Sequence, residues 1–444
     1  MRNLWDTLSA GAQDSLITAG LLLPLAVIAA ILLRGFAPWA LVRAILWRFR
    51  WANLIFVLLI SVSVGMGIGV IVQERGLRQG MAHAADKFDL VVSAPGSELT
   101  MTLATIFLRP SDVPLLSGRV YQDIADHENV DIAAPIAFGD SYLTAPLIGT
   151  IDAFVRHLGD GEIEGRMWQT STEAIAGAAA PVRIGDVFTP VHGQEDDHDE
   201  EEEDEHGHHH DGFDLTVVGR LPPSGTPWDH AILIPVEGVW EVHGLANGHA
   251  PERGDRIGPP FDPDYFPGTP AVIVRSSALW ANYALKSDFT RDSETMAFFP
   301  GTVLANLYRV MGDIRQAMSL MSLVTQGLVA ASVLMGLFIL TRLFQRQTAM
   351  LRALGAPRRF VMAVVWCYGA SMLTLGTLGG ILAGYATTAI LSRIVSARTD
   401  VLVTATLGWS EIHLACGFLS GTALLSLLPA ILVMRTPIAE GLRA

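Results

Sequence analysis

The segment richest in metal-binding side chains is His192–Asp211, which reads HGQEDDHDEEEEDEHGHHHD. It holds 11 acidic residues, no basic residue, and six histidines: His192, His198, His206, His208, His209 and His210. Imidazole suits zinc, copper and nickel, and carboxylates add charge attraction for any divalent cation. The spacing is of low complexity and has no fixed ligand geometry such as HExxH. The pattern therefore predicts weak binding of metal ions that exchange readily with solvent. Such binding suits sensing or collection of metal better than catalysis.

Three interpretations of this segment stay open. It is a solvated acidic loop without a role, a flexible loop that collects divalent metal, or a structural metal site. We expect disorder over residues 192–212 in any case, because the segment has no apolar side chain to bury. Zinc or another divalent metal, held weakly by these histidines, is the one cofactor that the sequence suggests, and none is expected to bind tightly.

The remaining residues offer little other chemistry. Five scattered histidines are interpreted as ordinary surface or core residues: His127, His157, His230, His243 and His249. Glu411 and His413, near the start of the last apolar run, could pair with each other. No GxSxG, SxxK or paired-carboxylate motif stands out, so we expect no independent enzymatic activity and assign no catalytic residue. No GxxxxGK[ST] occurs, so ATP could act only through a separate subunit. No basic patch with interleaved aromatic residues suggests nucleic acid as a partner.

Hydropathy predicts the elements that carry these residues. The 444 residues are 50% hydrophobic, with a mean hydropathy of +0.39, which is typical of an integral membrane protein. Five apolar runs predict about five transmembrane helices, one N-terminal and four core: Leu16–Leu33, Ala52–Val72, Met321–Leu340, Val361–Leu391 and His413–Met434. A cleaved signal peptide is the alternative for the first run, but Arg34 follows it where a small-residue cleavage site would stand. The predicted fold class is an α-helical integral membrane protein with a large mixed α/β extracytoplasmic domain.

Four regions follow from this pattern. Residues 1–51 hold the first span and a basic interfacial helix, 52–72 the first core span, 73–315 the extracytoplasmic domain, and 316–444 three core spans with a cytoplasmic helix at 342–359. Short runs between turn signals predict strands at Asp89–Ser93, Asp131–Ala137, Phe213–Val218, Ala231–Ile234 and Ala271–Val274. Helices are predicted at Val120–Asp126, Pro235–His243 and Ser277–Asn282, and Gly301–Ser319 should run without a break into the next span.

The stretch Arg342–Phe360, RLFQRQTAMLRALGAPRRF, lies between two of the predicted spans. It carries five arginines and no acidic residue, as does a short loop on the cytoplasmic side of a membrane. Leu351, Ala353 and Leu354 lie among good helix formers, so we expect a short helix here. Gly355 should end that helix, and Pro357 follows two residues later. With the basic stretch Arg34–Arg50 also inside, the N-terminus lies outside the membrane and the C-terminus in the cytoplasm.

The sequence RQTAMLRALGAPRR at Arg346–Arg359 resembles a cytoplasmic loop of the FtsX/MacB-type ABC transporter permeases. In that family the loop typically reads like RREIAVLRALGASRRQ. The tail RTPIAEGLRA at Arg435–Ala444 and the order of one span, a large outside domain and three spans are also similar to that family. The resemblance implies a homodimer in a bacterial cytoplasmic (inner) membrane that works with a cytoplasmic ABC ATPase, often by mechanotransmission. It also implies a set of ATPase-coupling residues: Arg346, Met350, Leu351, Arg352, Ala353, Leu354 and Gly355.

The chain departs from the family in two ways, an extra N-terminal span and Gln347-Thr348 where an acidic pair is common. A client related to divalent metal, a lipoprotein or a small amphiphile is compatible with the sequence, as is an extracytoplasmic metal-binding or lipoprotein partner. The rival hypothesis is a metal-binding membrane receptor or sensor without an ATPase partner. A secondary transporter has little support, because the spans hold few charges and no inverted repeat is evident.

Overall fold

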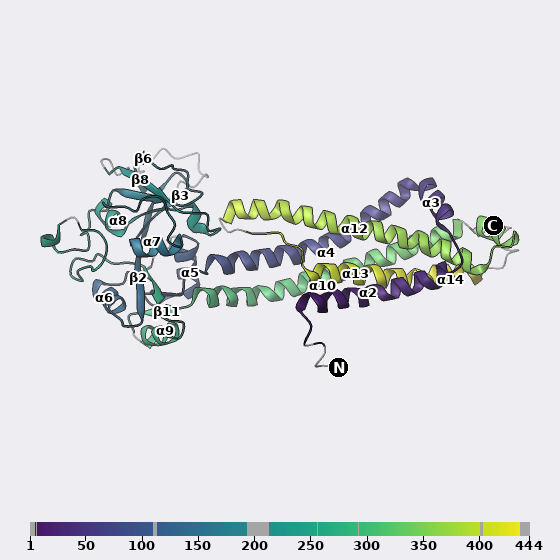
Figure 1. The fold of residues 1–444 in the computed structure, drawn as a ribbon, viewed down its shortest axis with the longest axis horizontal. Coiled ribbons are helices and arrows are strands. Elements are labelled where there is room, and N and C mark those ends of the chain that lie inside the picture. Colours follow the sequence, from purple (N-terminus) through teal and green to yellow (C-terminus); the bar gives the residue numbers. More distant parts are fainter. Residues whose placement is uncertain are drawn as a thin grey trace. The chain divides into compact units, whose positions relative to one another are not determined.

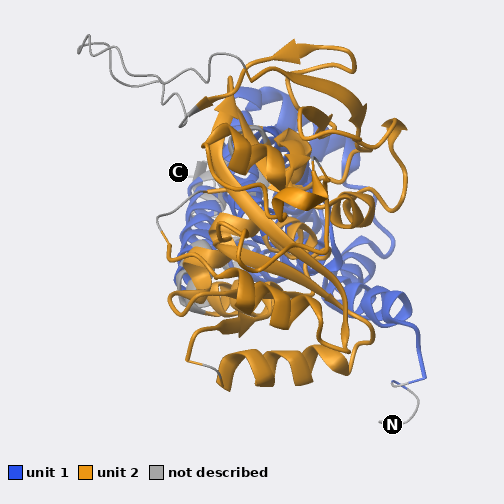
Figure 2. Cartoon of the chain, turned by 90° about the vertical axis from the view of Figure 1, so that its left-hand side faces the viewer, with its two compact units in different colours: residues 1–77, 312–393, 404–444 blue, residues 78–311, 394–403 orange. Residues whose placement is uncertain are grey.

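The computed structural model describes residues 5, 7–109, 113–192, 213–254, 256–291, 293–343, 345–399 and 403–435. The chain divides into two compact units (Figure 2). Unit 1 comprises Met1–Leu77, Gly312–Arg393 and Thr404–Ala444, and unit 2 comprises Arg78–Met311 and Ile394–Val403. Unit 1 is helical, whereas unit 2 is built on a β-sheet (Figure 1).

Long helices make up unit 1, and three of them continue into unit 2. The helices are α2 (Ala10–Leu33), α3 (Trp39–Arg48), α4 (Arg50–Ala84), α10 (Pro300–Leu343), α11 (Gln345–Ala353), α12 (Arg358–Thr399), α13 (Trp409–Leu425) and α14 (Leu427–Arg435). Helix α10 is unbroken, which confirms the prediction that the segment after residue 300 runs directly into the next apolar stretch. The short helix predicted within Arg342–Phe360 is also confirmed, as α11.

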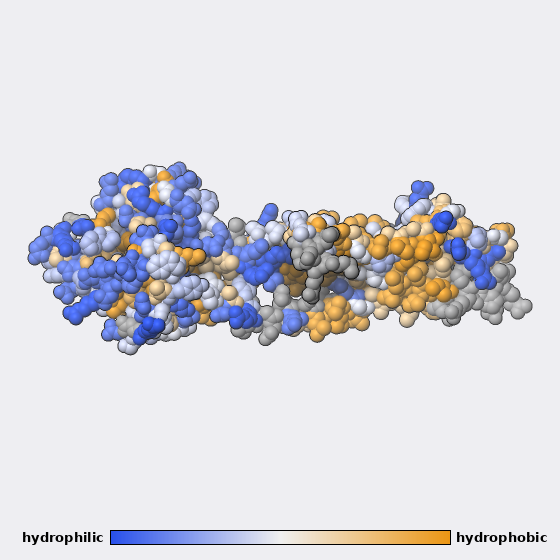
Figure 3. Space-filling model, turned by 60° about the horizontal axis from the view of Figure 1, so that its bottom comes forward, coloured by the Kyte–Doolittle hydropathy of each residue, from blue (hydrophilic) through white to orange (hydrophobic). Residues whose placement is uncertain are grey.

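Four helical stretches in the described part of the chain are long and apolar enough to cross a membrane: Ala10–Leu33, Arg50–Ala84, Arg358–Ser396 and Trp409–Ile431. They overlap four of the five predicted spans, of which His413–Met434 extends past Ile431. The fifth predicted span, Met321–Leu340, lies in α10, where the apolar stretch found among described residues is the shorter Leu323–Gly336. Hydrophobic surface gathers on the helices of unit 1 and hydrophilic surface on unit 2 (Figure 3).

Unit 2 contains eleven described strands in one mixed sheet. Its order is β11-β1-β10-β2-β3-β9-β5-β8-β4, with β6 paired to β8 and β7 paired to β2. The strands are β1 (Leu90–Ser93), β2 (Val130–Tyr142), β3 (Ala145–Thr150), β4 (Glu164–Gly165), β5 (Glu173–Ala176), β6 (Val187–Phe188), β7 (Val191–His192), β8 (Leu215–Arg220), β9 (Ile232–Pro235), β10 (Ala271–Ser276) and β11 (Met296–Phe298). The β3–β9 and β5–β8 pairs are parallel and the other pairs are antiparallel.

Helices pack on this sheet and cover its apolar side chains. They are α5 (Glu98–Ile106), α6 (Gly118–Ala125), α7 (Asp152–Leu158), α8 (Val236–Val242) and α9 (Ala281–Arg291). The strands β9 and β1 are buried along their whole length, as expected for strands covered on both faces. The mixed α/β class predicted for the polar region is therefore correct.

The five predicted strands correspond to β1, β2, β8, β9 and β10, and two of the three predicted helices correspond to α6 and α8. The third, Ser277–Asn282, is wrong because the helix there is α9, which starts at Ala281 and ends at Arg291. Ala281 and Leu285 are fully buried and Phe289 packs against the core, so one apolar face recurs every four residues. The charged residues between them face outward, and this is why the polar half of the helix was missed.

Candidate functional site

Helix α11 contains five of the seven residues that the family resemblance assigns to ATPase coupling, and Leu354 and Gly355 directly follow it. After Ala353 the chain leaves the helix through backbone hydrogen bonds from Gly355 N–H to Arg352 C=O (3.1 Å) and from Ala356 N–H to Leu351 C=O (2.9 Å). Gly355 has φ +96°, a left-handed conformation that only glycine adopts without strain. Pro357 follows, and α12 begins at Arg358. The predicted helix stop is therefore present in the structure, and it separates α11 sharply from α12.

The exposed side chains of this segment include large apolar ones. Met350 is 61% exposed and Leu354 is 82% exposed, whereas the neighbouring Ala349 is buried. Met350 and Leu354 are four residues apart and so lie on one side of the turn. Ala353 and Gly355 are exposed, Leu351 and Arg352 are half-buried, and the side chain of Arg346 lies outside the described part of the structure. The arrangement is a short projecting helix end with an apolar tip.

The helices α4 and α12 of unit 1 approach each other through glycines. A Cβ added to Gly384 would lie 2.7 Å from the backbone oxygen of Gly65, and one added to Gly380 would lie 2.9 Å from that of Ser61. The Ser61 hydroxyl donates a hydrogen bond to Gly376 C=O across the same contact (3.0 Å). Gly65, Gly380 and Gly384 therefore allow the backbones of α4 and α12 to approach each other closely.

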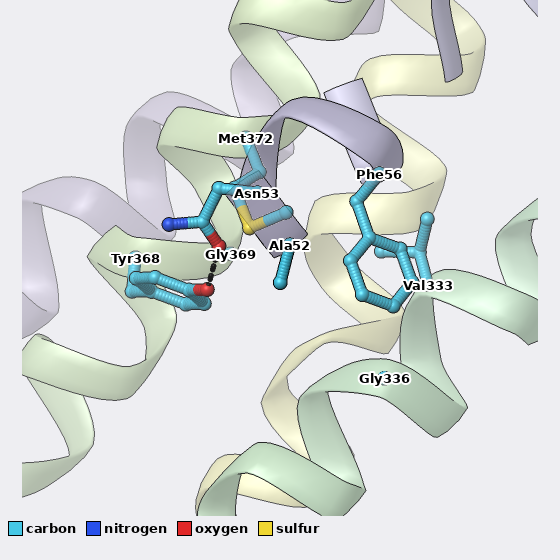
Figure 4. Close-up of a pocket in the computed structure, with 8 residues that line it drawn as sticks. All are labelled: Ala52, Asn53, Phe56, Val333, Gly336, Tyr368, Gly369 and Met372. Carbon is cyan, nitrogen blue, oxygen red and sulfur yellow. Dashed lines mark hydrogen bonds between the residues drawn. The ribbon is translucent and has the colours of Figure 1, made fainter. Parts of the chain in front are cut away.

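Helix α10 meets this pair beside a buried polar contact (Figure 4). The Tyr368 hydroxyl of α12 donates a hydrogen bond to the Asn53 side-chain oxygen of α4. Phe56 of α4 faces Gly336 of α10, where any larger side chain would collide with its ring. The cavity between the three helices is about 40 Å³, which is room for about one water and far below the usual size of a ligand site.

Two pairings near the start of α13 differ from the prediction. Glu411 is buried and forms an ion pair with Arg75 of α4 at 2.8 Å, and it also accepts the Gly408 N–H (2.8 Å). His413 instead contacts the Asp14 backbone oxygen of α2 at 3.1 Å. The suggested Glu411–His413 pair is therefore wrong, because residues two apart on a helix point in different directions.

The structure describes only part of the histidine-rich segment. His192 is the last residue of β7, where it stands opposite Asp140 of β2, so the disorder expected over 192–212 does not include its backbone. His198, His206, His208, His209 and His210 lie outside the described residues. Among the residues that are described, no group of three or more histidine, cysteine or acidic side chains gathers as a ready metal site.

A contact that the sequence did not reveal involves His243, which directly follows α8. Its Nε2 lies 3.5 Å from Oδ1 of Asp140, whose side chain is 1% exposed. The sequence analysis interpreted His243 as an ordinary histidine. No spacing rule could have joined it to Asp140, because their proximity depends on α8 packing over β2 and β3.

A second concave feature of unit 2 lies at the carboxyl ends of the parallel strands β3 and β9. The cavity measures about 420 Å³, and it is lined by polar and apolar residues that include Thr150, Asp152, Trp168, Gln169, Glu237 and Ile257. Glu237 is 1% exposed, accepts the Gly258 N–H, and lies 3.5 Å from Nε2 of the fully buried His249. Crevices at this edge of an α/β sheet are frequent ligand sites. The polar groups of this one suit a small molecule with hydrogen-bond donors.

Comparison with known proteins gives the chain no family. No model of a known protein family matches it, and no curated protein matches it.

Proposed function

We propose that this chain is the permease subunit of an ABC transporter of the FtsX/MacB type, in a bacterial cytoplasmic membrane with its C-terminus inside. A separate cytoplasmic ATPase hydrolyses ATP, and the chain couples that cycle to its α/β unit by mechanotransmission or export. The support is the combination of four helices with the length and composition of spans, a large sheet unit and a basic segment between α10 and α12.

The observation that carries the proposal is the exposed apolar tip of α11. Met350 lies in α11 and Leu354 directly follows it, both side chains are exposed, and Gly355 ends the segment before α12 begins. Exposed apolar side chains rimmed by arginines suit a protein partner better than water. A groove in an ATPase would bury these two side chains, and the nearby Arg352, Arg358 and Arg359 would contact acidic groups at its rim.

Motion imposed on this segment would pass along single helices. Helices α4 and α10 each run without interruption through residues of both units, so a displacement at one end is carried by helical hydrogen bonds. The close glycine contacts of α4 and α12 leave little side-chain volume to absorb such a displacement. This arrangement suits mechanical transmission, and the cavity of about 40 Å³ between α4, α10 and α12 offers no route for a substrate there.

The partners in the proposal follow from the apolar surface of unit 1. Leu54, Leu58 and Val62 of α4 and Leu378 and Leu382 of α12 are exposed in the single chain. Lipid covers most such surface in a membrane, and a second copy of the chain covers the rest in a homodimer. An extracytoplasmic metal-binding protein or lipoprotein is the further partner that the acidic, histidine-rich segment favours.

The test is co-purification of an ATPase with the full-length protein from its own membranes. Leu354→Glu puts a charge on the exposed tip of α11 and should abolish ATPase recovery, with at least a tenfold loss. Leu279→Glu is the matched control, because Leu279 is equally exposed (83%) but belongs to unit 2. Recovery of the ATPase with the Leu354 variant at the level of the control would contradict the proposed docking segment.

The second candidate function is a metal-binding membrane receptor without an ATPase, favoured by the six histidines and 11 acidic residues of His192–Asp211. Replacing Glu195–Asp211 with a Gly-Ser linker separates the two functions. Loss of a metal response with the ATPase still bound makes the segment an accessory of the permease. Metal binding in a protein that never recovers an ATPase favours the receptor.

A further inference from the structure

Helix α3 buries one side and exposes the other. The residues that pack against the core of unit 1 are Leu41, Val42, Ile45 and Leu46. On the opposite side Trp39, Arg43 and Trp47 follow one another at intervals of four residues, so they share one face of the helix. Trp39 is 57% exposed and Trp47 is 72% exposed. Exposed aromatic rings in a row indicate a surface that another molecule covers.

The arginines of this region have no acidic partner. No aspartate or glutamate occurs between Asp14 and Glu74 in the sequence. Within the part of the chain that the structure describes, Arg43, Arg48 and Arg50 are exposed, and none of them forms an ion pair. The positive charge of this face is therefore not compensated by the protein, and it is complementary to an anion from outside.

Aromatic rings position two of these arginines. The Arg50 guanidinium carbon lies over the Trp47 ring, 5.4 Å from its centroid, and over the Trp51 ring at 5.8 Å. Arg48 lies over the Phe49 ring at 5.9 Å. These are cation–π distances. A guanidinium held in this way keeps its N–H donors free, and their planar fork matches two oxygens of a phosphate group.

The exposed face of α3 lies near the start of α12. Phe36, which precedes α3, forms an edge-on contact with Phe360 of α12, and the ring centroids are 5.9 Å apart. Phe360 directly follows Arg358 and Arg359 in the sequence. Basic residues favour the cytoplasmic boundary of a membrane, and tryptophan favours the depth of the headgroups. In the proposed topology this end of unit 1 therefore meets the headgroups of the cytoplasmic leaflet.

We propose that this face binds the phosphate groups of anionic phospholipids in the cytoplasmic leaflet. The face consists of Trp39, Arg43, Trp47, Arg48, Arg50 and Trp51. The indoles enter the boundary between headgroups and acyl chains, while the guanidiniums bind phosphate oxygens. A headgroup with net negative charge is preferred to a zwitterionic one, because no acidic side chain balances the arginines. The inference goes beyond the proposed function: it rests on insertion of unit 1 in a membrane and does not depend on the ATPase.

Asn53 connects this face to the other helices of unit 1. Its Nδ2 donates a hydrogen bond to the Leu46 C=O in the last turn of α3 (2.9 Å), and its Oδ1 accepts the Tyr368 hydroxyl of α12. Asn53 is buried, so a swing of α3 about Phe49 would break hydrogen bonds that water cannot easily replace. A lipid bound to α3 would thus hold the first turn of α4 at the depth of the headgroups.

The experiment measures the lipid preference of the full-length protein after delipidation in detergent. Phosphatidylglycerol and phosphatidylcholine with the same acyl chains are titrated separately, and bound lipids are counted by native mass spectrometry. We expect the wild type to bind the anionic lipid at least about fivefold more tightly, as one arginine–headgroup contact predicts. The triple variant Arg43→Gln/Arg48→Gln/Arg50→Gln should lose this preference.

The matched control is Arg119→Gln/Arg183→Gln/Arg291→Gln, which removes the same charge from exposed positions of unit 2 and should keep the preference. Loss of arginines beside a span can also alter its orientation, so a second variant retains every charge. Trp47→Leu/Trp51→Leu removes the rings that position Arg50, and the preference should fall by about twofold. Recovery of each variant in washed membranes tests insertion separately.

Equal binding of the two lipids by the wild type would overturn the inference. An inserted arginine variant with the wild-type preference would also overturn it, and would place the bound lipid elsewhere on the chain. If that variant kept its lipid preference but lost the ATPase, the face would be a protein interface instead. ATPase recovery is measured on the same preparations, so failure of the lipid site and failure of the permease proposal are distinguished.

Discussion

At the scale of single residues, unit 2 places His157 in contacts that favour its neutral ring. Its Nε2 lies 3.1 Å from the Lys87 C=O, and the Arg275 guanidinium lies 3.1 Å from its Nδ1. Burial is the main cause that lowers the pKa of His157, with the charges of Arg275 and Lys87 adding to it, against the Lys87 carbonyl and Asp89, which raise it. The neutral ring is thus the form that the folded state favours.

This lowered pKa predicts a pH dependence of stability. As pH falls through about 6.5 the unfolded chain takes up a proton before the folded one, so the contribution of His157 is complete above that pH and declines below it. Unfolding midpoints measured from pH 7.5 to 5 should fall less steeply for His157→Gln than for the wild type. His83→Gln, at an exposed position, is the control. Parallel profiles for wild type and His157→Gln would refute the expectation.

The buried Glu237–His249 pair predicts a large loss of stability on truncation. Both side chains are at most 1% exposed, and His249→Ala would leave the Glu237 carboxylate with the Gly258 N–H but without the imidazole. Leaving a buried polar group short of a partner costs about 1–3 kcal/mol. Hydrogen exchange across β9 and α8 should show that loss of protection.

The control for that measurement is His83→Ala, which removes a pair whose side chains are 51% and 66% exposed. Its effect should stay within about 0.5 kcal/mol, as for most exposed ion pairs. Equal protection in the two variants would mean that the buried pair contributes little to the stability of unit 2.

At the scale of secondary-structure elements, the contact of α4 with α12 depends on the absence of side chains. A Cβ at Gly384 would stand 2.7 Å from the Gly65 oxygen, whereas a Cβ at Gly421 of α13 would have no atom within 4 Å. Gly384→Ala should therefore destabilise unit 1 by about 1–3 kcal/mol, the usual cost of overpacking. Gly421→Ala should be neutral or slightly stabilising, because alanine favours a helix.

The measurement is the thermal midpoint of the detergent-solubilised protein followed by fluorescence-detected gel filtration. A lower midpoint for Gly384→Ala alone supports direct backbone contact between the two helices. Equal midpoints for the two variants would show that α4 and α12 can separate without cost, and mechanical transmission through them would lose its physical basis.

The same elements show what local sequence information can predict. The span-like helices follow from apolar runs, and the end of α11 follows from Gly355 and Pro357, because each signal is contained within a few residues. The contact of α4 with α12 could not be predicted in this way, because the two helices are far apart in the sequence. Strand β3 was missed because it contains Pro146 and Gly149, and β5 because two of its four residues are alanine, and all of these residues are weak strand formers.

At the scale of the whole molecule, the division into a helical unit and a sheet unit agrees with the hydropathy of the sequence. The contact between Asp140 and His243 shows the limit of that information. Neither residue had a local signal in the sequence. They meet because α8 packs over β2, and that contact depends on the tertiary fold.

The β6–β8 ladder also bears on how the chain could change over evolution. Val187 pairs with Thr216 and Phe188 with Leu215, so the sheet itself joins the two sides of the insertion that contains the acidic stretch. Closing a longer insertion between strands that are already paired costs little entropy, about 0.6 kcal/mol for each doubling of length. The acidic stretch can therefore be lengthened, shortened or removed at little entropic cost while the pairing of β6 with β8 remains.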